Sequence, residues 1–474
     1  MTVSPAHSLS LDVERDVVLA HATSIVAGAW RSFDRYRPGQ PEVGEELREL
    51  FRRALPDQAS PALAALDAAA AALDASLAQP RPRFFAFIGS SALEIGVLAD
   101  ALAACFDVNL ASWAGAASEI EDQAVRWVGE FVGFAGEAGA FTSGGTISNL
   151  TALTAARERA LPGSRRSGLG GRRLALYCSA ESHYSVVRAA ELLGVGTDGV
   201  RALPIDASRR LRPDAVAEAI DADRAAGIVP LAVVATAGTT LTGAIDPLAE
   251  LAGLCAERGV WLHVDGAYGL PAAGTPDAAP LFAGVERADS VTIDAHKWLY
   301  LPKACGVVLV RRRADLERAF GHEEGYFPHE RRTPHAVDTT LEYSRPFRAL
   351  KLWLAFRVHG ADAFRVAIHR NLEQARLLYR LVGETPHLEP LPLAPPLSIV
   401  PFRHVPPGVA DLDAHNAELV RRLQAGGEVW VAPATIDGAC WLRPCIVNYR
   451  TSDDDVAALV ELVRTVGDEL AAES

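Results

Sequence analysis

Residues 292–302 read TIDAHKWLYLP and place a histidine and a lysine at the end of a short apolar run. Such a run is typical of a strand, and in an open α/β sheet ligands bind beyond the carboxyl ends of the strands. Only three of the 46 lysine and arginine residues are lysines, and Lys297 is one of them. Taken alone, it could be an ordinary solvated lysine. A lysine amine can nevertheless lose its proton and react, whereas the arginine guanidinium stays charged.

The composition argues against several classes of function. The chain has 474 residues, of which 49% are apolar, so it can fill the cores of two or three domains. A formal net charge of -13 repels nucleic acids and anionic membranes, and we expect neither as a partner. We find no signal peptide or membrane span. Six cysteines without a C-x-x-C pair predict reduced thiols and a cytoplasmic protein.

The hydrophobic pattern divides the chain into three regions. Residues 1–79 read as an N-terminal helical arm. In residues 80–348, helical stretches alternate with the apolar runs RLALYCS, PLAVVAT, VWLHVD, DSVTID and CGVVLV, which predicts a large α/β domain with a mainly parallel sheet. The Gly/Arg stretch LPGSRRSGLGGRR within it reads as a surface loop. Residues 349–474 begin with a long helix and continue with SIVPF, EVWVA, CWLRPCIVNY and a capped helix at TSDDDVAALVELV, so they predict a small α+β domain.

Reactive side chains follow several of the predicted strands. A glycine turn, FTSGGTISN, also opens a predicted helix, whose backbone N–H groups can bind an anion. The residues after the strands and in this turn are His183, Thr239, Thr240, Asp265, His296, Lys297, Thr146 and Ser148. Each has an ordinary explanation alone, as a helix cap, a core histidine or a plain turn.

Together these residues fit a phosphorylated aldehyde cofactor, pyridoxal phosphate. A lysine amine can bind the aldehyde covalently. A carboxylate at the pyridine nitrogen keeps that nitrogen protonated, so that the ring can accept electrons from a bond broken at the substrate. An imidazole can stack on the ring, and the helix N-terminus can neutralise the phosphate. We therefore predict Lys297, Asp265 and His183 as the catalytic residues.

At these positions the sequence resembles the group II pyridoxal-phosphate decarboxylases, the family of aromatic amino acid and glutamate decarboxylases. The motifs HVDGAYG, DAHKWLYLP, SAESHYSVVRAA, TSGGTISN and ATAGTT occur in the family's order. The resemblance implies that Lys297 carries the cofactor, Asp265 pairs with its ring nitrogen and His183 stacks on it. It further implies cofactor contacts for Ala267, His296, Gly145, Thr146, Ser148, Thr239 and Thr240.

The resemblance also implies a fold and a quaternary structure. The fold would be pyridoxal-phosphate fold type I, as in aspartate aminotransferase, in a homodimer with interlocking arms and with its active site at the interface. Residues 82–113 would face the substrate, and Arg443, in WLRPCIVNYR, would bind a substrate carboxylate. The substrate-site residues predicted in this way are Phe87, Ser90, Asn109, Ala111, Tyr326 and Arg443.

The function implied is decarboxylation of an L-amino acid, which we expect to be aromatic. An acidic substrate stays open, because the phosphate loop is closest to that of glutamate decarboxylases. An oxidative variant that makes an aldehyde also stays open, because only Tyr326 and Tyr343 are present in the region where relatives supply a protonating tyrosine. An aminotransferase, a carbon–sulfur lyase and a noncatalytic binding protein are the remaining alternatives. The histidines and acids of residues 322–335 form no closed ligand set, so no metal site is predicted.

Overall fold

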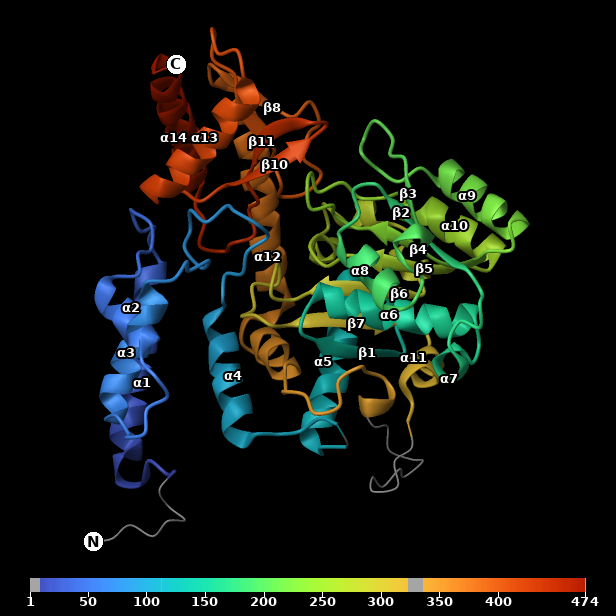
Figure 1. The fold of residues 1–474 in the computed structure, drawn as a ribbon, viewed down its shortest axis with the longest axis horizontal. Coiled ribbons are helices and arrows are strands. Elements are labelled where there is room, and N and C mark those ends of the chain that lie inside the picture. Colours follow the sequence, from blue (N-terminus) through green and yellow to red (C-terminus); the bar gives the residue numbers. More distant parts are fainter. Residues whose placement is uncertain (1–8, 112, 323–335, 474) are drawn as a thin grey trace.

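The computed structural model describes residues 9–111, 113–322 and 336–473. It contains a seven-stranded sheet and a separate four-stranded sheet, with helices covering both (Figure 1). This confirms the predicted α/β class, with a mainly parallel sheet, a helical N-terminal segment and a smaller C-terminal α+β unit. The predicted domain boundaries after residues 79 and 348 stay predictions.

The large sheet has the strand order β1-β7-β6-β5-β4-β2-β3. Within it, β7 pairs antiparallel with both of its neighbours, and the other pairings are parallel. All five apolar runs predicted as strands of this sheet are strands. The bounds are β1 Ala138–Thr142, β2 Leu174–Ser179, β3 Val200–Leu203, β4 Val229–Thr236, β5 Trp261–Asp265, β6 Ser290–Asp294 and β7 Gly306–Val310.

Helices cover both faces of the large sheet because alternate residues of its strands point to opposite sides. In β2, Leu174, Leu176 and Cys178 pack in one apolar cluster with α6 and α8, while Ala175 and Tyr177 belong to the cluster on the other face. The first face carries α6 Gly145–Ala160, α8 Ser185–Leu192 and α11 Arg313–Phe320, and the second carries α5 Ala116–Val132, α9 Pro213–Ala225 and α10 Leu248–Arg258.

Short helical turns connect these elements. The stretch predicted as a Gly/Arg loop contains one of them, α7 Ser164–Ser167, so that prediction was wrong in this detail. Glu158 orders this turn, because its carboxylate accepts hydrogen bonds from the backbone of Gly163 and Arg165 and from the Ser164 hydroxyl. The 3-10 helices are Asp12–Glu14, Thr197–Gly199, Leu270–Gly274, Ala279–Phe282, Val285–Arg287 and Ala336–Asp338.

The C-terminal unit packs on the end of a long helix. This helix, α12 Ala349–Glu384, packs beside α4 Glu94–Phe106 and is interrupted at Gly360, where φ is 72°. The small sheet consists of β8 Leu388–Pro390, β9 Phe402–His404, β10 Ala432–Ile436 and β11 Ala439–Arg443, covered by α13 Leu412–Gly426 and α14 Asp453–Ala472.

The predictions for this unit held in part. Ser452 caps α14 in a reciprocal capping box with Asp455, as its sequence pattern indicates. The runs SIVPF and EVWVA were placed too early in the chain, since β9 begins only at Phe402 and β10 only at Ala432. Isolated bridges at Ile399 and Trp430 replace regular pairing there.

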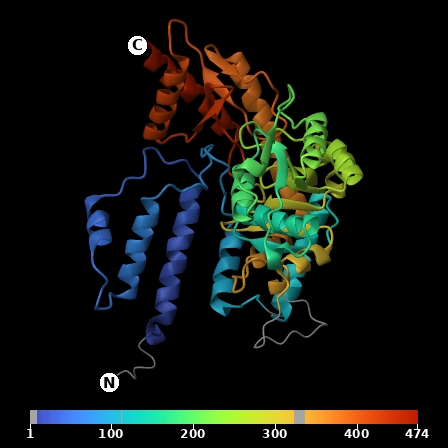
Figure 2. The ribbon, with the colours of Figure 1, turned by 45° about the vertical axis from the view of Figure 1, so that its right-hand side comes forward.

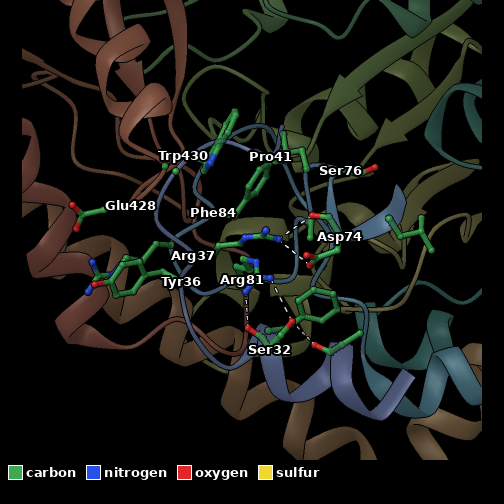
Figure 3. A pocket seen from close by; sticks show the side chains of 18 of the residues that line it. Ser32, Tyr36, Arg37, Pro41, Asp74, Ser76, Arg81, Phe84, Glu428 and Trp430 are labelled. Carbon is green, nitrogen blue, oxygen red and sulfur yellow. Dashed lines mark hydrogen bonds and ion pairs between the residues drawn. The ribbon is translucent and has the colours of Figure 1, made fainter. Parts of the chain in front are cut away.

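The N-terminal helices stand beside the rest of the chain. They are α1 Arg15–Phe33, α2 Glu45–Arg52 and α3 Ala62–Asp74, and none of them contains a buried residue. Figure 2 shows all three lying apart from the large sheet. A cavity of about 360 Å³ separates this arm from Phe84 and Trp430 (Figure 3). Within it, Arg81 donates to the Ser32 carbonyl and Arg37 pairs with Asp74 at 2.8 Å.

Across the described ranges, no helix combines the length and the apolar character needed to cross a membrane.

Candidate active site

A cavity of about 330 Å³ opens where the carboxyl ends of the parallel strands meet. Thr236, Asp265 and Asp294 are the last residues of β4, β5 and β6, and all three line it. Loops that follow the strands supply the rest of the lining. The sequence-predicted residues gathered there are Gly145, Thr146, His183, Thr240, Asp265, Ala267, His296 and Lys297.

The glycine turn after β1 forms one wall of the cavity. Gly144 precedes the first residue of α6, so the unpaired N–H groups of the first helical turn are at the cavity. A Cβ atom on Gly145 would lie 3.1 Å from both Ala267 Cβ and Asp294 Oδ2. Glycine therefore lets the backbone approach these residues closely and leaves a cradle suited to an anion.

Asp265 is held by Asn149, a residue of α6. The Asn149 amide donates to Asp265 Oδ2 at 2.8 Å and to the Ser185 hydroxyl oxygen at 2.9 Å. Ser185 Oγ lies 2.9 Å from Nδ1 of His183. One amide thus positions the predicted pyridine partner and, through Ser185, the predicted stacking histidine. Burial lowers the pKa of His183, which favours a neutral ring.

A second row of polar groups continues behind Asn149. Its Oδ1 accepts from Nε2 of the fully buried His263 at 3.0 Å, and Nδ1 of His263 lies 2.8 Å from Ser290 Oγ. The Trp261 indole N–H donates to the same hydroxyl oxygen at 2.9 Å. Burial lowers the pKa of His263 to about 4, so the ring is neutral at pH 7. These bonds orient the Asn149 amide with its NH2 group toward Asp265.

Lys297 lines the same cavity. Its Nζ is 3.0 Å from Asp294 Oδ2, and Asp294 is itself buried. His296 points its Nε2 toward the same carboxylate at 3.8 Å, while its Nδ1 accepts the Cys305 backbone N–H. Burial lowers the pKa of His296. The amine and an ionisable carboxylate therefore share one water-poor corner of the cavity.

Two predicted cofactor contacts lie outside the cavity lining. The Ser148 hydroxyl is buried at 2.7 Å from Thr142 Oγ1, and Thr239 bonds to Thr242 and to the Ala244 backbone. Both hydroxyls thus shape the turns that carry Thr146 and Thr240.

The predicted substrate residues are dispersed around the cavity. Arg443 contacts a residue of the lining, since this buried guanidinium donates to the Thr240 carbonyl at 3.2 Å. Ser90 donates to the Leu301 carbonyl, and Asn109 Oδ1 accepts the N–H of the buried Ala111. Phe87 is half exposed, and Tyr326 lies outside the described residues.

Sequence reasoning missed Asn149, Ser185 and Asp294 as lining residues. Asn149 and Ser185 are in the quoted motifs TSGGTISN and SAESHYS, but no local pattern indicates that they contact each other. Asp294 was visible as the last residue of a predicted strand, and its position three residues before Lys297 could have marked it.

Comparisons with known proteins agree on one family. The family described as "Pyridoxal-dependent decarboxylase conserved domain" matches residues 44–405. The aromatic-L-amino-acid decarboxylase of Bacillus atrophaeus is 34% identical over 400 residues, which are 82% of each chain. The L-2,4-diaminobutyrate decarboxylase of Rhizobium meliloti is 34% identical over 340 residues, covering 71% of this chain and 67% of that protein. The crystal structure of Oryza sativa TDC with PLP and tryptamine superposes with a TM-score of 0.91 at 26% identity, covering 99% and 100% of the two chains.

The residues of the cavity fit pyridoxal phosphate. The Gly145 cradle suits a phosphate, and a carboxylate, an imidazole and a lysine amine, the groups that a pyridine aldehyde requires, line the same cavity. The match with the family profile covers well over half of the chain, and the fold agrees over almost its full length. The protein therefore belongs to the pyridoxal-phosphate-dependent decarboxylase family and is a carboxy-lyase that acts on amino acids.

Proposed function

We propose that this enzyme decarboxylates an aromatic L-amino acid to its amine and carbon dioxide. The observation that carries the proposal is the convergence of Lys297, Asp265 and His183 on one cavity. The aromatic substrate class is supported by the names of relatives, which include the Bacillus atrophaeus enzyme.

Pyridoxal phosphate, when bound, supplies a ring that accepts the electron pair released from the bond between the substrate's α-carbon and its carboxylate. Lys297 would hold the cofactor through its side-chain amine. Asp265 would keep a proton on the ring nitrogen, and Asn149 holds the Asp265 carboxylate in place for this task. His183 would stack on the ring, and the N–H groups around Gly145 and Thr146 would bind the phosphate.

Arg443 is proposed to recognise a substrate carboxylate. Its guanidinium is buried, and burial lowers its pKa. Within the described part of the chain, no ion pair with a carboxylate is found for it, and its Nη1 contacts the carbonyl of the cavity residue Thr240. A buried cation without a counter-charge is costly, so an incoming carboxylate would be bound favourably.

We further propose that the active enzyme is a homodimer with active sites at the interface. The helical arm supports this, because apolar side chains are left in solvent along it: Val13, Val17, Leu19, Phe51, Leu55 and Leu73. Apolar surface of this extent is typical of an interaction site. A second chain would cover these residues and order the arm against it.

We also propose a cellular compartment and keep two alternative reactions. The six cysteines are free thiols in the structure, which supports a reducing compartment and hence the cytoplasm. The region in which relatives supply a protonating tyrosine contains only Tyr326 and Tyr343, so the oxygen-coupled reaction that makes an aldehyde is the second candidate function. An acidic substrate remains the alternative specificity.

The test is product mass spectrometry after incubation of the cofactor-loaded protein with each common L-amino acid in air. We expect an aromatic amino acid to lose carbon dioxide and to keep its nitrogen. An aldehyde together with hydrogen peroxide would establish the oxidative reaction instead. Turnover of glutamate or aspartate alone would contradict the aromatic assignment, and a keto acid product would contradict decarboxylation.

A further inference from the structure

Three of the chain's 13 histidines and one aspartate form a cluster in the C-terminal unit that the decarboxylation chemistry does not use. His387 lies just before β8, His404 ends β9, and Asp468 is in the last turns of α14. One potential ligand atom from each of these three residues lies within 4.8 Å of the other two. Figure 1 shows β8 and α14 with the C-terminal unit, away from the large sheet whose strand ends form the active site.

Both histidines direct a ring nitrogen at the same carboxylate oxygen. Asp468 Oδ1 is 2.8 Å from His387 Nδ1 and 3.3 Å from His404 Nε2. Tetrahedral zinc, with ligands at about 2.0–2.1 Å, holds neighbouring ligand atoms about 3.3 Å apart. The 3.3 Å edge already has this length, and the 2.8 Å edge needs to open by only about half an ångström. Arg464 pairs with the other oxygen of this carboxylate, Oδ2, at 3.2 Å, so Oδ1 is the oxygen that faces both imidazoles.

The surroundings of His404 favour a metal-binding form of its ring. His404 is fully buried, and its Nδ1 lies 2.8 Å from Nε2 of His415, a buried residue of α13. When the Nδ1–H group of His404 donates a hydrogen bond to His415, Nε2 carries a lone pair directed at the cluster. A metal-bound histidine usually has this arrangement, in which one ring nitrogen binds the metal and the other donates a hydrogen bond.

The backbone near the cluster has an unusual conformation at one residue and a close approach at another. His387 has a φ of 64°, a left-handed conformation that is uncommon for residues other than glycine. Gly467 precedes Asp468, and a Cβ atom on it would lie 2.7 Å from His404 Nδ1. Glycine at 467 therefore makes room for the His404 ring beside α14. Such local strain is commonly retained where a side chain must reach a specific position.

We propose that His387, His404 and Asp468 bind a divalent transition-metal ion of the zinc type, with His415 as a positioning residue for His404. Two imidazoles and one carboxylate suit zinc and its neighbours among the transition metals, and they suit magnesium and calcium poorly. Three protein ligands leave a fourth position for water on the side where His387 and Asp468 reach solvent. The bound ion connects three parts of the C-terminal unit, namely β9, α14 and the residue that precedes β8. It therefore stabilises this unit.

The test uses the chelator-treated holoenzyme, titrated with Zn2+ in competition with a chromophoric chelator. His387→Ala is the first variant, because its side chain is 40% exposed and its loss does not disturb the core. The matched control is His369→Ala, which removes a histidine of similar exposure that also pairs with an aspartate, Asp277, at 2.9 Å. We expect His387→Ala to weaken Zn2+ binding by at least about 100-fold, and His415→Ala by roughly 10–100-fold.

The location and the class of the ion are tested separately. Zn2+ should raise the thermal midpoint of the wild type and of His369→Ala but not that of His387→Ala, since only a ligand that binds the folded state stabilises it. Anomalous diffraction from Zn2+-loaded crystals should place the ion between His387, His404 and Asp468. Equal Zn2+ affinity in His387→Ala and His369→Ala, an ion at another place, or Mg2+ binding as tight as that of Zn2+ would each overturn the proposal.

Discussion

The side-chain amide of Asn149 donates a 2.8 Å hydrogen bond to Asp265 Oδ2, although the two residues are 116 positions apart in the chain. The same amide contacts Ser185, which bonds to His183. Asn149 thereby connects Asp265, which is proposed to bind the ring nitrogen of the cofactor, with His183, which is proposed to stack on the ring.

Replacing Asn149 with Ala should weaken cofactor binding and lower turnover together. A hydrogen bond to a charged group contributes about 1.5–3 kcal/mol, so we expect losses of roughly 10- to 100-fold. The cofactor dissociation constant, followed by visible absorbance, is the readout that does not depend on activity. Asn416→Ala is the control, because Asn416 is equally buried but bonds to the His404 backbone. An Asn149→Ala protein with wild-type cofactor affinity would remove this residue from the site.

Lys297→Ala should abolish both turnover and the visible absorbance of the protein-bound cofactor, because no other amine lines the described cavity. Lys297→Arg should be equally inactive, since a guanidinium does not lose its proton at accessible pH. The control is Lys303→Ala, which removes an exposed lysine that bonds to Gln79. Retained absorbance in Lys297→Ala, or its loss in Lys303→Ala, would show that the covalent attachment is elsewhere.

Asp294→Asn should tighten the binding of pyridoxal phosphate to the cofactor-free protein. The Asp294 carboxylate lies beside the Gly145 cradle and pairs with Lys297 at 3.0 Å. Two like charges roughly 4 Å apart in water repel by about 1 kcal/mol, so removing the Asp294 charge from the cradle should raise the affinity for the phosphate group about fivefold. Equilibrium titration measures it, with Asp315→Asn, a buried aspartate paired with Arg312, as the control. Weaker cofactor binding in Asp294→Asn would contradict the prediction and would show that the carboxylate is needed for the structure of the site.

Stability should depend on pH through His263. Burial lowers its pKa from 6.5 to about 4 in the folded protein. The unfolded chain therefore takes up a proton near pH 6.5, and the folded chain does so only near pH 4. The stability that His263 contributes through its neutral form is complete above pH 6.5 and is lost as the pH falls toward 4.

We therefore expect the free energy of unfolding of the wild type to fall more steeply between pH 6.5 and 4 than that of His263→Gln. Glutamine retains a donor toward Asn149 but does not titrate. Urea denaturation across this pH range gives both curves. Parallel curves would contradict a neutral, buried His263.

The local sequence determined the parts of this protein that depend on neighbouring residues. Apolar runs such as that of residues 289–294 become strands because their side chains fill both faces of a covered sheet. The glycine turn opens α6, and Ser452 caps α14, because these conformations are set within a few residues. The parallel order of strand and helix then brings His183, Asp265 and Lys297 to one edge, so the core of the site could be predicted.

Tertiary structure alone decided the contacts between distant segments. Asn149 meets Asp265, and His387 meets Asp468, only after helices and strands have packed, and no period in the sequence records such a pair. Ser148 and Thr239 are a different case, because their hydroxyls bond within their own turns, to Thr142 and to the Ala244 backbone, and lie outside the cavity lining. Local patterns set which elements form, whereas packing selects which side chains of those elements face one another.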